Sequence, residues 1–365
     1  MKKYKWDVFE IRQNINTLES YLHNYQHEDT KNIIESVINQ YCEMTASISG
    51  NYNYDFYIDY KMSLTKCMEE YTYDLNDSSL PLIELLLDTF EIIKNIIPQQ
   101  NIDYIVNYNN DYLVNLTNDY LKDTLPPKYL NRYYRLIKNN PNYLNIRYDK
   151  TCTCGATYID PILNKKYISF FRRNEIFDLS TIGHEVFHMI FNDNFAYTIN
   201  SNPMYYTREI ESAFSEFLFT DWIDNKTIVS SSNIRNNHFT YFQIRILNFM
   251  VLKIYFDAIN NNKFSKKIFN QEWKKLNYDH TLTISDIKDL WNGENAYDNL
   301  VYSFSYVAAL DLYYIHQNDP EYAFYLLDKI RSVRYSDNPI KVLRKHQLTF
   351  MDDDFSNLRQ YVKNI

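Results

Sequence analysis

Glycine and proline are scarce in this sequence, with 4 glycines and 9 prolines among 365 residues. Both residue types interrupt helices, and stretches of alternating polar and apolar residues are also few. The sequence therefore predicts a mostly helical protein with a small β-sheet. The length allows a large core and one or two domains.

An excess of positive charge is also missing. The chain has 46 acidic and 38 basic residues, a formal net charge of −8, and no long run of one sign. Nucleic acids select basic surfaces, so this composition argues against a nucleic-acid partner. The most apolar window, 239–259, is interrupted by Arg245, Lys253 and Asp257. We therefore expect a buried helix there and no membrane span.

Cysteines number 4, and no stretch near the N-terminus has the apolar core of a signal peptide. We therefore expect a cytoplasmic protein whose thiols stay free. Cys152 and Cys154 form a C-x-C pair without a second pair, which is weak evidence for an additional metal site.

The motif H-E-x-x-H spans His184 to His188. Residues four apart lie on the same face of a helix, so the two imidazoles can bind one metal ion. Glu185 projects beside them and can reach the water that such a metal activates. This is the arrangement that a zinc hydrolase needs.

Apolar residues at helical spacing surround the motif, and Asp178 is the predicted N-cap. A second helix, predicted for 205–221, contains Glu209 and Glu216 seven residues apart on one face. A catalytic zinc site needs a third protein ligand. We expect Glu209 to be this ligand and Glu216 to accept a hydrogen bond from a ligand imidazole.

The alternative is a helix that carries two surface histidines and no metal. His23 and His27 are also four apart, but they lack the adjacent glutamate and the apolar setting, so we interpret them as part of a solvated face. The apolar setting of His184 and His188 favours a metal, because buried charged groups are rare unless they are paired or metal-bound.

Three β-prone stretches, 144–148, 158–159 and 167–171, precede the motif. A sheet edge beside a catalytic metal can bind a peptide as an extra strand. The predicted substrate strand is therefore formed by Tyr167, Ile168, Ser169, Phe170 and Phe171. A purely structural hairpin fits the spacing equally well.

Tyr302 and Tyr306 lie four apart in a helix predicted for 297–316. Tyrosines near a metal can donate their O–H to a developing oxyanion. In a chain with 36 tyrosines, packing in the core is the more frequent role for such a pair.

Together these residues resemble the oligoendopeptidase F and thimet oligopeptidase family of zinc metallopeptidases. The resemblance covers residues 145–365, whereas residues 1–140 share only their helical character with it. The motifs that carry it are, in chain order, Gly155-Ala156, Tyr167 to Phe171, Asp178, Thr181, His184 to His188, the E-x-x-S-x-x-x-E pattern of Glu209, Ser212 and Glu216, and the aromatic repeat of Tyr302, Phe304 and Tyr306.

The resemblance implies a mostly helical peptidase with a small sheet lining a deep cleft, which cuts peptides instead of folded proteins. Residues 1–140 would be a wall or lid of the cleft, and 141–365 the catalytic region. One Zn²⁺ would be bound by His184, His188 and Glu209, with Glu185 as general base. Tyr306, and with it Tyr302, would polarise the scissile carbonyl, and the Tyr167–Phe171 stretch would align the substrate.

The sequence departs from the family pattern in three ways. Phe187 stands where the family usually has glycine, and the stretch 293–298 lacks the histidine that the family often carries upstream of its tyrosines. Family members are also usually longer at the N-terminus, so their substrate size limits do not transfer directly.

The leading hypothesis is a zinc endopeptidase that acts on unfolded peptides, with Glu185 passing a water proton to the leaving amine. One alternative is a zinc carboxypeptidase, in which Arg172, Arg173 and Arg208 would be candidates to bind the terminal carboxylate. Another is a peptide-binding protein that has lost turnover. The missing histidine and Phe187 favour this last alternative, and the intact metal set opposes it.

Overall fold

The computed structural model describes the chain in segments. They are residues 4–25, 27–49, 80–96, 108–149, 154–175, 177–191, 207, 209–226, 231–260, 266–275, 296–331, 343, 345, 348 and 355–363. These residues are mostly helical and include one small sheet, as the sequence predicts. No helix among them is long and apolar enough to cross a membrane.

The chain divides into two compact units that are each assembled from separate stretches of sequence. The first comprises Met1–Lys61, Asp103–Asn200 and Leu218–Ser230, and the second comprises Met62–Ile102, Ser201–Phe217 and Ser231–Ile365. The boundary expected at residue 140, between an N-terminal region and a catalytic region, stays a prediction.

The sheet of the first unit has the strand order β1-β3-β2. β3 is parallel to β1 and antiparallel to β2. Both backbone edges of β3 are already paired, so a peptide cannot add to the Tyr167–Phe171 stretch as an extra strand. Another role of these residues in substrate binding stays a prediction. The strands are β1 (Leu144–Tyr148), β2 (Cys154–Asp160) and β3 (Lys165–Arg172).

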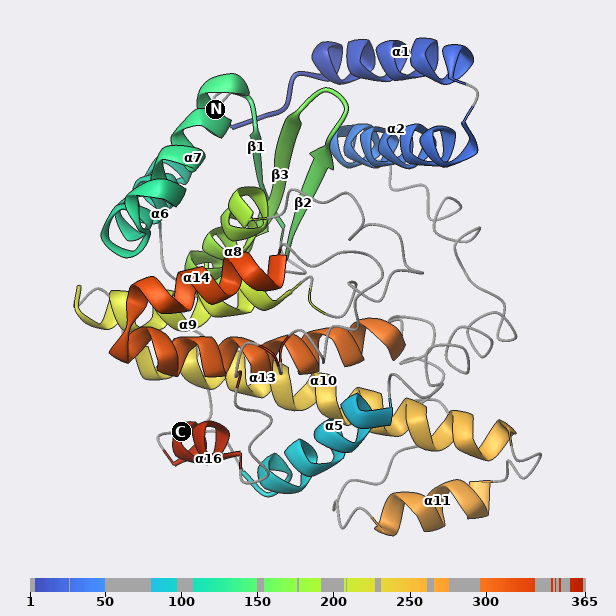
Figure 1. Cartoon of the computed structure of the whole chain (residues 1–365), viewed down its shortest axis with the longest axis vertical. Coiled ribbons are helices and arrows are strands. Elements are labelled where there is room, and N and C mark those ends of the chain that lie inside the picture. Colours follow the sequence, from blue (N-terminus) through green and yellow to red (C-terminus); the bar gives the residue numbers. More distant parts are fainter. Residues whose placement is uncertain are drawn as a thin grey trace. The chain divides into compact units, whose positions relative to one another are not determined.

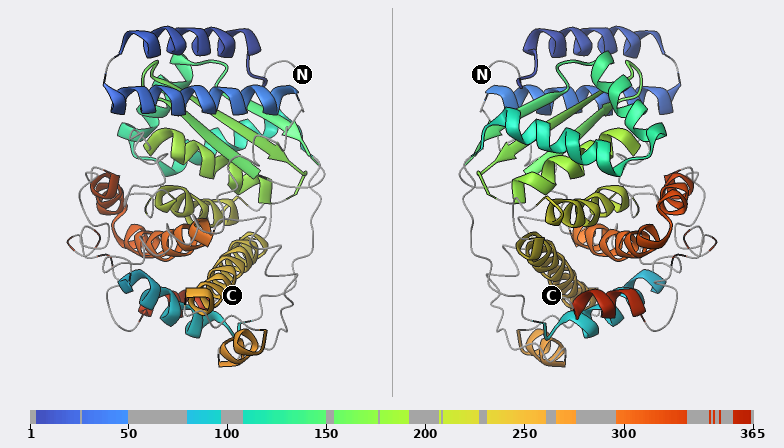
Figure 2. Two further views of the ribbon diagram at one scale, coloured as in Figure 1. Left: turned by 90° about the vertical axis from the view of Figure 1, so that its right-hand side faces the viewer. Right: turned by 90° about the vertical axis from the view of Figure 1, so that its left-hand side faces the viewer.

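The two faces of this sheet are covered by different helices. α1 (Val8–Asn24) and α2 (Glu28–Ser49) lie on one side of β2 and β3, and α8 (Phe177–Phe191) lies on the other (Figure 1, Figure 2). Side chains alternate between the faces of a strand. Tyr158 and Tyr167 pack into the cluster formed with α1 and α2, whereas Thr157 contacts α8.

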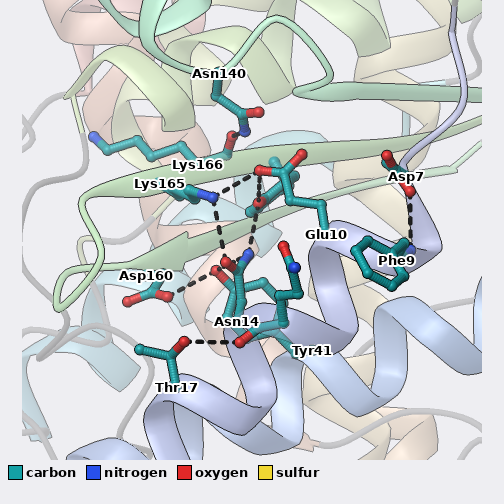
Figure 3. A network of polar contacts seen from close by, with 12 residues as sticks. Asp7, Phe9, Glu10, Asn14, Thr17, Tyr41, Asn140, Asp160, Lys165 and Lys166 are labelled. Atoms are coloured by element: carbon teal, nitrogen blue, oxygen red, sulfur yellow. Dashed lines mark hydrogen bonds and ion pairs between the residues drawn. The ribbon is translucent and has the colours of Figure 1, made fainter.

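A buried polar network fastens α1 and α2 to the sheet (Figure 3). The hydroxyl of Tyr41 donates to the carboxylate of Asp160 at 2.7 Å. The amide of Asn14 donates to the hydroxyls of Tyr41 and Tyr167 at 3.3 and 3.0 Å. Burial, together with the Asp160 carboxylate, raises the pKa of Tyr41, so the hydroxyl keeps the proton that it donates.

Two further helices of the first unit pack against α8. α6 (Asn110–Thr124) begins after Asn109, whose side chain accepts the backbone N–H of Tyr112 at 2.8 Å, as an N-cap residue does. α7 (Pro127–Asn139) begins with a proline at its first position, where a missing N–H removes no helical hydrogen bond. These helices complete the apolar surroundings of α8.

In the second unit, α13 contacts α5, α10, α14 and α16, and α10 also contacts α11. The first part of α9, up to Phe217, belongs to this unit and is joined to α14 by a buried ion pair between Glu211 and Arg331. The helices are α5 (Leu80–Ile93), α9 (Ile210–Asp224), α10 (Ser231–Asn260), α11 (Lys266–Lys275), α13 (Ala296–Asn318), α14 (Pro320–Arg331) and α16 (Ser356–Val362).

Replacement of Arg331 by methionine is expected to destabilise the protein strongly. Glu211 is fully buried, so loss of its partner leaves a buried charge without compensation, which costs about 3–5 kcal/mol. Urea denaturation followed by circular dichroism measures this loss. The double variant Glu211→Leu with Arg331→Met should recover most of it, and a single variant as stable as the wild type would contradict the expectation.

Candidate metal centre

Asp178 stabilises the start of α8, but it is not the N-cap residue that the sequence predicts. The helix begins one residue earlier, at Phe177, and Asp178 lies within its first turn. Its carboxylate accepts the backbone N–H groups of Arg173, Asn174 and Glu175 at 3.2, 2.7 and 3.2 Å. The predicted cap therefore bonds backward to the loop that leaves β3, and so fixes the direction in which α8 leaves the sheet.

The hydroxyl of Tyr108, which precedes α6, also donates to Asp178. Burial and this hydrogen bond raise the pKa of Tyr108, so the tyrosine stays protonated. At the other end of α8, the ammonium group of Lys166 on β3 donates to the carbonyl of Met189 at 2.8 Å. A cation at the C-terminal end of a helix satisfies carbonyls that have no helical partner.

His184, His188 and Glu209 come together as the sequence predicts. Each offers one ligand atom, and these atoms lie within 4.8 Å of one another. The two imidazole rings have centroids 4.9 Å apart, as expected for residues separated by one helical turn. Two imidazoles and one carboxylate form a ligand set known for catalytic zinc, so these side chains fit a zinc ion.

Glu209 lies in the turn before α9, which begins at Ile210. The predicted start of this helix, Tyr205, lies outside the described residues. Its carbonyl accepts the N–H of Ala213 at 3.0 Å, which begins the helical hydrogen bonding. The hydroxyl of Ser212 lies 3.0 Å from this carbonyl and 3.2 Å from the Glu209 carboxylate. Ser212 therefore orients the carboxylate that we expect to bind the metal.

Glu185 is 4% exposed and lies against the outer strand β2. The hydroxyl of Thr157 lies 2.6 Å from Oε2 of Glu185 and 2.9 Å from the backbone carbonyl oxygen of Glu185, and can donate to either. A Cβ atom added to Gly155 would lie 2.4 Å from Cγ of Glu185, so only glycine fits at this position. Gly155 is part of the sequence resemblance, but only the structure shows why glycine is needed there. No sequence motif marks Thr157 as a partner of Glu185.

Phe187 is fully buried and packs away from the sheet. Its ring stacks on Tyr120 of α6 with centroids 6.2 Å apart, and it also contacts Phe191 at 5.3 Å. The residue that departs from the family pattern therefore fills the apolar contact between α8 and α6.

Glu216 lies near a buried histidine of α10. Nε2 of His238, on α10, is 4.0 Å from Oε2 of Glu216, and the His238 side chain is 1% exposed. No motif marks His238 in its long helix, and only the fold brings it to α9. The role of Glu216 as an acceptor for a ligand imidazole stays a prediction.

Tyr306 is packed among aromatic rings in the second unit. Its ring stacks on Phe242 with centroids 4.2 Å apart, and its hydroxyl donates to that of Tyr361 at 3.5 Å. Burial raises the pKa of Tyr306, and the neighbouring Tyr361 and Glu216 add to the effect. Tyr302 contacts the ring of Tyr241 and lies under the guanidinium of Arg245. A catalytic role for either tyrosine stays a prediction.

Two of the three arginines that are candidates to bind a substrate carboxylate have protein partners. Arg172 donates to the carbonyl of Tyr108 at 3.1 Å, and Arg173 forms an ion pair with Glu175 at 2.8 Å. Arg208 lies outside the described residues.

We expect the purified protein to bind about one Zn²⁺ per chain after zinc loading and dialysis. His188→Ala removes one of three ligands and should abolish stoichiometric binding, as measured by elemental analysis. The matched control replaces both His23 and His27, which are exposed and also four residues apart, and should keep the metal. Equal zinc content in both variants would contradict the assignment.

The sequence matches no protein-family model, and no curated protein matches it in sequence. Solved structures do match the fold. A protein described as oligoendopeptidase F is 12% identical with a TM-score of 0.59, and the match covers 100% of this chain and 77% of that one. A Pz peptidase A with an inhibitor is 11% identical with a TM-score of 0.57, covering 100% and 78%.

A protein of Chlamydophila abortus described as a peptidase is 14% identical with a TM-score of 0.53, and the match covers 96% of this chain. The chain spans only 62% of the length of that protein. The family resemblance seen in the sequence is thus confirmed at the level of the fold. The chain has the fold of oligoendopeptidase F and Pz peptidase A, and it carries a His-His-Glu group that can hold a metal ion.

Proposed function

We propose that the protein is a zinc-dependent endopeptidase that hydrolyses unfolded peptides. The observation that carries this proposal is the convergence of His184, His188 and Glu209, with Glu185 on the same helix as the two histidines. A zinc ion in this group supplies Lewis acidity, which polarises a peptide carbonyl and lowers the pKa of water.

Glu185 is the general base in this proposal. Its carboxylate takes a proton from the attacking water and delivers it to the leaving amine. The hydrogen bond from Thr157 and the contact with Gly155 hold the carboxylate in one position, which reduces the reorganisation needed during proton transfer. Thr157 is therefore a positioning residue.

The outer edge of β2 replaces β3 as the proposed binding edge for the peptide backbone. β3 is paired on both sides, and among the described residues no strand pairs with the second edge of β2. The outer edge of β1 is in contact at Ile146, whose N–H donates to the carbonyl of Tyr4 at 2.9 Å. A peptide that pairs with β2 would lie next to Glu185, as cleavage requires.

Arg172 and Arg173 already bind protein groups, the carbonyl of Tyr108 and the carboxylate of Glu175. This favours an endopeptidase over a carboxypeptidase, which needs a cation to bind the terminal carboxylate of its substrate. Amidation of a peptide C-terminus separates the two activities: an endopeptidase cleaves the amide as well as the acid. A protein without turnover would bind such peptides and release them intact.

Glu185→Gln should lower kcat for peptide cleavage by about 100- to 10,000-fold, because the amide cannot accept the water proton. Mass spectrometry of a peptide mixture incubated with zinc-loaded protein gives both the cut sites and the rates. The variant should retain its zinc. Unchanged cleavage by Glu185→Gln would rule out this mechanism.

Thr157→Val should lower kcat by about tenfold to a hundredfold, since it removes a hydrogen bond to a charged group without changing the side-chain volume greatly. KM, zinc content and melting temperature should stay near the wild-type values. Thr157→Ser keeps the hydroxyl and should restore most of the rate. Equal rates for the valine and serine variants would show that the hydroxyl does not position Glu185.

A further inference from the structure

The side chain of Gln40, on α2, occupies the outer edge of β2. Its Oε1 accepts the backbone N–H of Ile159 at 3.1 Å. That N–H therefore points away from β3, and Ile159 and its partner Lys166 are a pair without mutual hydrogen bonds. Outward and inward backbone groups alternate along an antiparallel strand, so those of Gly155 and Thr157 also face outward.

The amide of Gln40 thus takes the place that a backbone amide of an added strand would take at Ile159. It supplies the acceptor that Ile159 requires. Its Nε2 is shielded from solvent and has no hydrogen-bond partner within the described part of the chain. A peptide that pairs with β2 at Gly155 and Thr157 would meet this amide at the next outward-facing position.

Gln40 is held rigidly because the next residue, Tyr41, belongs to the buried network that joins α2 to the sheet. Tyr41 donates to Asp160, the residue that follows Ile159, at 2.7 Å (Figure 3). Two consecutive residues of α2 thus bond two consecutive residues of β2. The Tyr41 bond thus anchors the backbone of α2 at Gln40 beside the end of β2.

The position of Gln40 along the strand relates it to the catalytic group. Thr157 bonds Glu185, and Ile159 lies two residues further, which is about 7 Å along a β-strand. On this side of Glu185 only a short part of a substrate can pair with β2. On the other side, toward Gly155, Gln40 imposes no limit.

We propose that Gln40 closes the peptide-binding edge of β2 at Ile159, and so determines how many substrate residues on one side of the scissile bond contribute to binding. This inference rests on the proposed function, because it concerns the same edge. It makes Gln40 a specificity-determining residue that is supplied by the N-terminal helices.

The test uses two peptide ladders, in which one good substrate is lengthened residue by residue at its N-terminus or its C-terminus. For the wild type, kcat/KM should stop rising after about two residues on one side only. In Gln40→Ala the N–H of Ile159 becomes available, so the same ladder should gain a further factor of about 2 to 10 from the next residues. The opposite ladder should not change.

Matched variants separate this effect from a general disturbance. Asn39→Ala, on the exposed side of α2, leaves Gln40 in place and should behave like the wild type. Gln40→Asn, whose amide is one methylene shorter, should open the edge and replaces Gln40→Ala if that variant is unstable. Superimposable ladder profiles for the wild type and both opening variants would overturn the proposal.

The same ladders are also measured by binding to zinc-loaded Glu185→Gln. If the wild type cleaves the peptides and the opening variants have the same dependence on peptide length, the role of Gln40 is rejected and the peptidase proposal stands. Binding without cleavage by the wild type rejects turnover, while the binding profile still tests Gln40. Peptides that are neither cleaved nor bound reject the proposed function and the role of Gln40 together.

Discussion

The close contact between Glu185 and the outer strand β2 is the constraint on which the rest of the candidate site depends. Its side chain lies so near Gly155 that a single methyl group would collide with it, and the hydroxyl of Thr157 fixes one carboxylate oxygen. The two contacts come from alternate residues of one strand, which face the same side of the sheet. The proposed general base and the proposed peptide edge are therefore one assembly.

This assembly requires that α8 keep a fixed position on the sheet, and both ends of the helix are bonded to it. The carboxylate of Asp178 accepts three backbone N–H groups of the loop that follows β3. The ammonium group of Lys166, on β3, donates to the carbonyl of Met189 in the last turn of α8. Phe187 packs against Tyr120 on the side of α6. Asp178, Lys166 and Phe187 are themselves buried, so a change in any one of these contacts is expected to shift the two histidines relative to β2.

If Gln40 closes the edge of β2, the N-terminal helices have a more specific role than the wall or lid implied by the sequence resemblance. α2 bonds the end of β2 through Gln40 and Tyr41. A strand that ends against a side-chain amide offers a short binding edge. Only a few substrate residues on that side of Glu185 could then pair with β2. Substrate length would then be sensed at the sheet itself.

Local patterns in the sequence were sufficient for the helical class and the three β-prone stretches, which depend on composition and periodicity. They also marked His184 and His188, one turn apart on a helix, and Glu209 at the start of the next helix. The order of the strands, and with it the edge at which a peptide could pair, was not accessible from the sequence, because the pairing of β3 with both neighbours depends on tertiary contacts. The bond between Thr157 and Glu185 joins residues 28 apart, and the bond between Gln40 and Ile159 joins residues 119 apart. Such contacts have no periodicity to reveal them, so only the tertiary structure decided what orients Glu185 and where the edge of β2 ends.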